Sequence, residues 1–162
     1  MNIYSVKKDT KYRELPLIFL DLETTGLEVQ NHEIIEIGAI RVNSKSPFEI
    51  EEELSLKVLP LDIKKAEKEA LKVNGYTEEK WKDAISLGDA LKTLEDFSKN
   101  GVVVGFNISF DWAFLHKAYS KIGKEEPFHY HRLDVLSMAY LKFFSDKSVG
   151  RFNLSSICEI LK

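Results

Sequence analysis

The sequence predicts an α/β domain with a mixed sheet of five strands and helices on both faces. The chain reads as three strands, two helices, and then strand and helix in alternation, an order expected of a sheet with helices packed on it. Short loops join the first three strands and favour an antiparallel meander. Residues 102–106 read VVVGF, and such a continuous apolar run is typical of a central strand parallel to the first.

The composition indicates one folded domain over residues 1–162. Of the 162 residues, 44% are apolar and 30% are charged, which are ordinary values for a globular protein. No apolar run is long enough to cross a bilayer, and the first residues lack the apolar core of a signal peptide, so we expect no membrane partner. Cys158 is the single cysteine, and we expect a small buried residue in a reducing cytoplasm.

The net charge limits how the protein can meet nucleic acid. At −3, the surface as a whole does not attract a polyanion. A nucleic-acid substrate would have to be held locally, by metal ions, backbone amides and a few side chains. This favours an enzyme that grips the end of a strand over a protein that coats a duplex.

The first half of the chain carries the antiparallel strands and one helix. Residues 1–15 are a polar lead-in. Turn residues bound three apolar runs, which predict strands at Pro16–Glu23, Glu33–Val42 and Phe48–Val58. A helix is then expected from Asp62, a suitable N-cap, to the Asn74-Gly75 stop.

The second half alternates helices with short strands. Ser86–Lys99 is the clearest amphipathic helix, and Ser86 with Asp89 resembles a capping box. The remaining expected elements are a strand at Val102–Phe106, a helix at Ser109–Ile122, an edge strand at Phe128–Leu133, a helix capped by Asp134 that ends near Phe144, and a helix from Asn153 to Lys162.

The stretch LIFLDLETTGL at residues 17–27 organises the chain. A short apolar run is followed directly by Asp21 and Glu23. Residues two apart in a strand point to the same face, so the two carboxylates lie together and repel each other unless a cation sits between them. Mg²⁺ prefers such oxygen ligands. The alternative is a strand that ends in a polar turn, with both acids in solvent.

Asp111 is the second acidic position. It lies in the first turn of the helix that follows the 102–106 strand. If that strand lies parallel beside the first, their carboxyl ends coincide and Asp111 faces Asp21 and Glu23, where such sheets bind ligands. The alternative is an ordinary acid at a helix N-terminus, which backbone N–H groups favour.

Four motifs occur in the order of a known family. They are DLETTG at residues 21–26, EIIEIGAI at 33–40, NGYT at 74–77 and GFNISFDWAFL at 105–115. Together they resemble the DnaQ-like (DEDD) 3′→5′ exonuclease family, which includes the proofreading epsilon subunit of bacterial DNA polymerase III, ribonuclease T and oligoribonuclease. The resemblance covers nearly the whole chain and implies a ribonuclease H-like fold.

The resemblance also implies roles for single residues. Asp21, Glu23 and Asp111 match the catalytic metal ligands of the first two motifs, which implies two divalent ions, Mg²⁺ or Mn²⁺. Asn107 and Phe110 match residues of the second motif that shape the pocket for the terminal nucleotide. The turn after the first strand matches positions that cradle the same nucleotide, namely Leu22, Thr24, Thr25, Gly26 and Leu27.

The family's third motif is a His and an Asp on a late helix, acting as general base and fourth ligand. His129 and Asp134 have a spacing that would suit a helix, as do Tyr130 and Asp134. Residues 127–133 look extended, however, so we interpret Asp134 mainly as an N-cap. RFNLSSICEIL at 151–161 resembles the family helix that precedes the motif. We therefore expect the third motif beyond Lys162, and a domain that is incomplete at its C-terminus.

The sequence thus favours an enzyme, a metal-dependent 3′→5′ exonuclease that hydrolyses DNA at its 3′ end, as in proofreading or repair. One alternative is an RNA exonuclease of the same chemistry. Another is a catalytically incomplete domain that binds nucleic acid or a polymerase. The expected partners are a single-stranded 3′ end and a DNA polymerase catalytic subunit, and the expected location is the cytoplasm.

Overall fold

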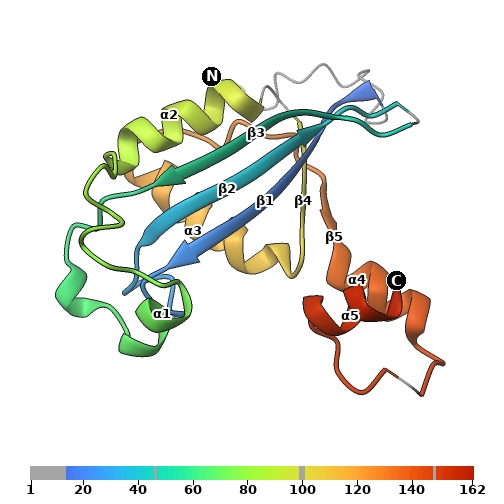
Figure 1. Cartoon of the computed structure of the whole chain (residues 1–162). Coiled ribbons are helices and arrows are strands. Elements are labelled where there is room, and N and C mark those ends of the chain that lie inside the picture. Colours follow the sequence, from blue (N-terminus) through green and yellow to red (C-terminus); the bar gives the residue numbers. More distant parts are fainter. Residues whose placement is uncertain (1–13, 46, 99–100, 148) are drawn as a thin grey trace.

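The computed structural model describes residues 14–45, 47–98, 101–147 and 149–162. Its centre is a five-stranded sheet in the order β3-β2-β1-β4-β5 (Figure 1). The first three strands pair antiparallel, β4 runs parallel to β1, and β5 runs parallel to β4. The predicted mixed α/β sheet is therefore confirmed. Most of the lead-in expected at residues 1–15 lies outside the described residues.

The elements follow the predicted order. The strands are β1 (Leu17–Thr24), β2 (Ile34–Val42), β3 (Ile50–Lys57), β4 (Val102–Gly105) and β5 (Arg132–Asp134). The helices are a 3₁₀ turn η2 (Ile63–Lys65), α1 (Lys68–Val73), α2 (Leu87–Ser98), α3 (Ile108–Lys121), α4 (Val135–Phe143) and α5 (Leu154–Ile160).

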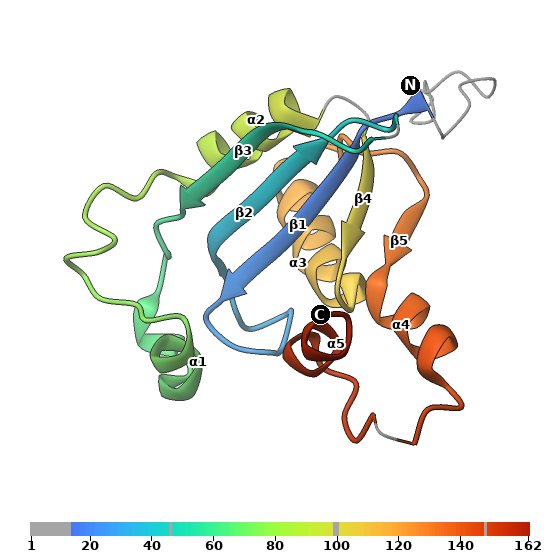
Figure 2. The ribbon, with the colours of Figure 1, turned by 45° about the vertical axis from the view of Figure 1, so that its right-hand side comes forward.

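The main core lies on the face of the sheet that α2 and α3 cover. Ile18, Leu20 and Leu22 alternate along β1 and are buried there, as the period of a strand requires. Figures 1 and 2 show the two helices behind the sheet. The buried hydroxyl of Tyr119 on α3 donates to the carbonyl of Leu91 on α2 at 3.0 Å, which ties the helices together.

The opposite face of the sheet is only partly covered. Helices α4 and α5 lie beside its β4–β5 edge (Figure 2). Val135 and Leu154 from these helices line a hollow together with Phe19 and Ile40 of the sheet. Phe19 is 39% exposed. Because Asp21 lies two residues after Phe19 on β1, it projects from this open face.

The helix expected from Asp62 to Asn74 is interrupted. Asp62 accepts a hydrogen bond from the N–H of Lys64 at 3.2 Å, but it caps only the 3₁₀ turn. Ala66 and Glu67 are extended, and the N–H of Glu67 donates to the carbonyl of Thr25 at 2.8 Å. This long-range bond replaces a helical one, so α1 begins afresh after Glu67.

Two smaller expectations are also corrected. Strand β5 is shorter than expected, because residues 128–131 precede it and it runs only from Arg132 to Asp134. Cys158 is exposed, not buried. Its neighbour Ile157 is the residue that α5 buries, and consecutive residues of a helix point in directions about 100° apart. Within the described residues, no helix is long and apolar enough to cross a membrane.

Candidate active site

Asp111 occupies the place where β1 and β4 stop pairing. Their parallel register ends at the pair Phe19 and Val104. Beyond it, the backbone N–H of Leu22 donates to Oδ1 of Asp111 at 3.0 Å. The predicted parallel neighbours are therefore found. Here the side chain of Asp111, from α3, replaces the β4 backbone as a hydrogen-bond partner of β1. This segment of β1 carries the two predicted acids, Asp21 and Glu23.

The pKa of each of the three acids is raised, mainly by burial. Asp111 is 4% exposed, and burial, followed by the charge of Asp21 and then that of Glu23, raises its pKa to about 7. Hydrogen bonds from the backbone N–H groups of Leu22 and Asp111 oppose this rise. Burial raises the pKa of Asp21, and burial, Asp21 and Glu36 raise that of Glu23. Negative charge here exceeds what the local hydrogen bonds compensate.

This acidic end, defined as Asp21, Glu23 and Asp111, has the chemistry of a cation site. Carboxylate oxygens suit hard divalent cations, and a cation would relieve the mutual repulsion. Across the described ranges, however, no three His, Cys, Asp or Glu side chains are arranged so that they could together hold a metal ion. One oxygen of Asp111 is turned to the N–H of Leu22. The predicted convergence on a shared ion stays a prediction.

The neighbours of Asp21 leave room beside it. In the antiparallel register, Asp21 lies opposite Gly38, which has no side chain. A hollow of about 620 Å³ opens there, lined by Phe19, Ile40 and Phe106 among others. Its walls are mostly apolar, with Asp21 at its margin, so a ligand with both an apolar part and a polar part fits its chemistry.

The turn after β1 is closed by its own hydrogen bonds. Oγ1 of Thr24 donates to the carbonyl of Gly26 at 2.8 Å, and Oγ1 of Thr25 accepts from the N–H of Glu33 at 3.0 Å. A Cβ on Gly26 would lie 2.5 Å from Nε2 of His32, so only glycine fits. Leu27 is 73% exposed and is available for contact with a ligand.

The residues predicted from the second motif lie at the start of α3. Asn107, at φ 61°, begins the helix, and its N–H donates to Oδ1 of Asp134 at 2.9 Å. The same oxygen accepts from the N–H of Leu136 at 3.0 Å, so the predicted N-cap is found. Phe110 packs on the core, with its ring 5.1 Å from that of Phe114. Asp134 thus joins the starts of α3 and α4.

The possible third-motif pair separates in space. His129 precedes β5, and its N–H donates to the carbonyl of Gly101, just before β4. Asp134 ends β5 and pairs with Gly105, at the far end of β4. The two side chains therefore lie at opposite ends of these strands, as the extended interpretation predicted.

Two residues that support the turn were not assigned this role from the sequence. His32 is buried and satisfied, with Nδ1 3.3 Å from Oγ1 of Thr25 and Nε2 3.1 Å from Oε1 of Glu67. Asn74, within the NGYT motif, donates its side-chain amide to the carbonyl of Thr24 at 2.8 Å. The motif gave a signal for Asn74, whereas no sequence pattern pairs His32 with Glu67.

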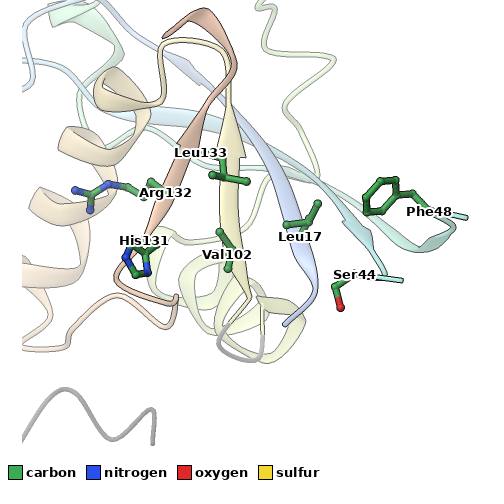
Figure 3. A pocket seen from close by; sticks show the side chains of 7 residues that line it. All are labelled: Leu17, Ser44, Phe48, Val102, His131, Arg132 and Leu133. Carbon is green, nitrogen blue, oxygen red and sulfur yellow. The ribbon is translucent and has the colours of Figure 1, made fainter. Parts of the chain in front are cut away.

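A second hollow, of about 600 Å³, lies at the other end of the sheet. Figure 3 shows it between the start of β1, the strands β4 and β5, and the β2–β3 turn. We call it the amino-end hollow, lined by Leu17, Ser44, Phe48, Val102, His131, Arg132 and Leu133. The guanidinium of Arg132 lies 4.2 Å from the ring centroid of Trp112 on α3.

Comparison with known proteins agrees with this architecture. The model of a family described as exonuclease, RNase T, matches residues 18–162. This chain belongs to that exonuclease family. The family is the DnaQ-like one that the motifs resemble, and the chain is accordingly a nuclease domain.

Related sequences are found within much longer polymerases. The chain is 28% identical over 120 residues to a DNA polymerase III PolC-type of Thermotoga petrophila, covering 74% of this chain and 8% of that protein. It is 32% identical over 106 residues to the PolC-type polymerase of Caldanaerobacter subterraneus, covering 65% of this chain and 7% of that protein. The chain thus spans less than a tenth of these relatives.

Solved structures of exonuclease I share the fold. A product-bound exonuclease I superposes with a TM-score of 0.74 at 15% identity, over 90% of this chain and 38% of that one. The E. coli enzyme in complex with a dT13 oligonucleotide gives 0.71 at 16% identity, over 90% of this chain and 35% of that one. At such identities the likeness establishes the fold alone, which confirms the predicted ribonuclease H-like architecture.

Proposed function

We propose that this domain is a metal-dependent 3′→5′ exonuclease that removes nucleotides from the 3′ end of single-stranded DNA. The observation that carries the proposal is the acidic end, where a buried carboxylate with a pKa of about 7 lies beside two further acids of the first motif. Clustered acids that perturb one another mark functional sites more often than structural ones.

Asp21, Glu23 and Asp111 are the residues that would hold divalent cations. Two such ions, Mg²⁺ or Mn²⁺, would supply an activated water and neutralise charge at the phosphodiester. Asp111 must release its proton to act as a ligand, so with a pKa of about 7 cation binding near neutral pH would be accompanied by proton release. Gly38 leaves space next to Asp21 for the phosphate.

The closed turn after β1 would hold the terminal nucleotide. Thr24, Thr25 and Gly26 fix its backbone, and the exposed Leu27 offers an apolar surface to a base. Asn107 and Phe110 would complete the pocket from α3. Because the turn is held by its own hydrogen bonds, it needs little ordering when the strand end binds.

The choice of DNA follows from the relatives. Those named above are DNA polymerases III of the PolC type, and one exonuclease I structure holds a dT13 oligonucleotide. A polymerase subunit is accordingly the protein partner we propose. An RNA exonuclease with the same acids is the second candidate, since discrimination depends on contacts to the 2′-hydroxyl.

A degradation assay tests the proposal. DNA and RNA single strands of one sequence, labelled at the 5′ end, are incubated with the chain and Mn²⁺. We expect the DNA label to shorten stepwise, and Asp21→Asn to stop the shortening. Glu53→Gln is the matched control, because Glu53 is an exposed acid that lines the same hollow. Faster loss of RNA would favour the second candidate. Binding of Mn²⁺ and of the 3′ end without degradation by any version would favour an incomplete domain.

The expected rate depends on whether the third motif lies beyond Lys162, as we interpret the sequence. A general base contributes about a hundred- to ten-thousand-fold in rate, so the 162-residue chain should act slowly. A longer chain that includes a downstream His and Asp on one helix should recover that factor. If the short chain is fully active and His129→Ala or Asp134→Asn abolishes its activity, our placement of the third motif is wrong.

A further inference from the structure

Lys117 attaches helix α3 to the β1–β2 loop, residues 25–33. Its Nζ donates hydrogen bonds to three backbone carbonyls of that loop, those of Val29, Gln30 at 3.2 Å and His32 at 2.9 Å. A lysine ammonium has three N–H donors and no acceptor. The three carbonyls therefore use its whole donor capacity, and one side chain holds a stretch of four residues.

The loop held by Lys117 is a single compact unit. The N–H of Thr25 donates to the carbonyl of Glu33 at 2.9 Å, which closes the two ends of the loop. Within it, the N–H of His32 donates to the carbonyl of Glu28 at 3.0 Å, and the His32 ring lies against Gly26. Holding the carbonyls on one side of this unit therefore also fixes the turn on its other side.

The two flanks of the loop are attached to different helices. On one flank, the N–H of Glu67, just before α1, donates to Thr25, and Asn74, just after α1, donates to Thr24. On the other flank the attachment is Lys117, on the same helix as Asp111. The two residues are six positions apart on the helix, about 9 Å along the axis. Figure 2 shows the loop turning away below the end of β1.

We propose that Lys117 is a positioning residue, which locks the β1–β2 loop to α3 and so fixes the turn Thr24–Leu27 relative to Asp111. The inference rests on the proposed function, in which this turn binds the terminal nucleotide. Lys117 donates to the loop and not to the acids. Its loss should therefore weaken binding of the strand end and leave the maximal rate nearly unchanged.

Three variants of the chain separate positioning from general stability. Lys117→Met keeps the length of the stem and removes the donors, whereas Lys117→Arg keeps the charge and changes the donor geometry. Lys121→Met is the matched control, because Lys121 is an exposed lysine one turn further along α3. The measurements are amide hydrogen exchange of residues 25–33, and single-turnover degradation of a labelled DNA strand with Mn²⁺ at increasing enzyme concentration.

We expect Lys117→Met to speed exchange at the loop amides of Thr25, His32 and Glu33. If the freed loop keeps its binding conformation about a tenth of the time, the half-saturating concentration rises about tenfold. The maximal rate should stay within about twofold, because binding rather than chemistry is lost. Lys117→Arg should recover part of the affinity, and Lys121→Met should match the parent chain.

Several results would overturn the inference. Unchanged loop exchange in Lys117→Met would show that the contact does not hold the loop. Faster exchange with an unchanged half-saturating concentration would show that the loop does not position the nucleotide. An equal effect of Lys121→Met would show that the loss of a positive charge on α3, and not the loss of the loop contact, causes the change. If the parent chain neither binds nor degrades a strand end while exchange still responds to Lys117→Met, the proposed function fails and the loop attachment stands alone.

Discussion

The carboxyl end of the sheet gathers acids, whereas at the amino end His131 and Arg132 line a mostly apolar hollow and His129 is buried nearby. At the acidic end, burial raises the pKa of all three acids, and like charges add to the rise at Glu23 and Asp111. At the amino end, burial and the neighbouring His131 lower the pKa of His129. The acidic end places acids of raised pKa side by side, whereas at the amino end burial favours the neutral form of the His129 ring. Only the first arrangement calls for a cation.

The two ends of the sheet also separate His129 and Asp134, which have the sequence spacing of a catalytic pair. His129 precedes the strand at the amino end, where the rings of His129 and His131 stack with centroids 5.0 Å apart. Asp134 ends the strand near Asn107 and caps α4. A strand of three residues is enough to separate them, because each residue advances the chain by about 3.3 Å.

The largest expected effect is on the pH dependence of stability. The pKa of Asp111 is raised from 3.8 to about 7, so the folded chain keeps this proton to higher pH than the unfolded chain does. The stability that comes from the retained proton is present below pH 4 and is lost as pH rises towards 7. Linkage puts this loss at about 4 kcal/mol at most, and Asp111→Asn should remove it. Urea unfolding without metal between pH 4 and 8 measures it.

His129 supplies the opposite sign in the same measurement. Its lowered pKa means that the unfolded chain binds this proton first, so its contribution to stability is lost as pH falls below about 6.5. The Asp111→Asn chain should therefore keep a loss of stability on the acid side that His129→Gln reduces. A fall in stability with rising pH that persists in Asp111→Asn would contradict the assigned pKa.

The next effect is on metal affinity. Asp111→Asn should weaken Mn²⁺ binding by more than about a hundredfold, since even losing a group that only orients a ligand costs about 10- to 100-fold. Titration calorimetry measures this, and two buffers of different ionisation enthalpy should reveal proton release near neutral pH. His131→Gln, at the amino end, is the control and should bind as the parent does. If Asp111→Asn binds Mn²⁺ as tightly as His131→Gln does, Asp111 is not a ligand and the ions bind elsewhere.

A smaller effect is expected at Asp134. Asp134→Ala removes the acceptor for the N–H groups of Asn107 and Leu136 and should lower the free energy of unfolding by about 1–2 kcal/mol. Asp134→Asn keeps an oxygen in place and should lower the free energy of unfolding by only about a few tenths of a kcal/mol, because Asn caps about as well as Asp. Chemical denaturation of the three chains separates the outcomes. Equal losses in both variants would argue for a role of the charge itself.

The smallest effect is expected at the rim of the amino-end hollow. Phe48 is 66% exposed, so Phe48→Ala should change the free energy of unfolding by no more than about 0.5 kcal/mol. Mn²⁺ affinity should not change either, because the hollow and the acidic end lie at opposite ends of the strands. A loss above that size would mean that the ring packs more tightly than its exposure indicates.

Much of the fold could be predicted from local patterns. The strand period placed Asp21 and Glu23 on one face, and the apolar stripe of residues 86–99 predicted the start of α2 within a residue, whereas its predicted end at Lys99 lies outside the described residues. Ser86 accepts from the N–H of Asp89 at 3.1 Å, as the capping box required. Such features depend on neighbours within one turn or one strand, so the sequence states them directly.

Tertiary structure decided the features that join distant segments. The N–H of Glu67 leaves the helical pattern for the carbonyl of Thr25, and this broke the helix expected from Asp62. Lys117 reaches residues 85 to 88 positions earlier in the chain, a pairing that no local spacing encodes. The motifs named Asp111, but its pKa of about 7 arises because β1 and β4 part and a buried carboxylate must replace their pairing next to two acids. Burial and long-range charge exist only once the chain has folded, so the sequence by itself identified the candidate acids, and the fold determined what their chemistry becomes.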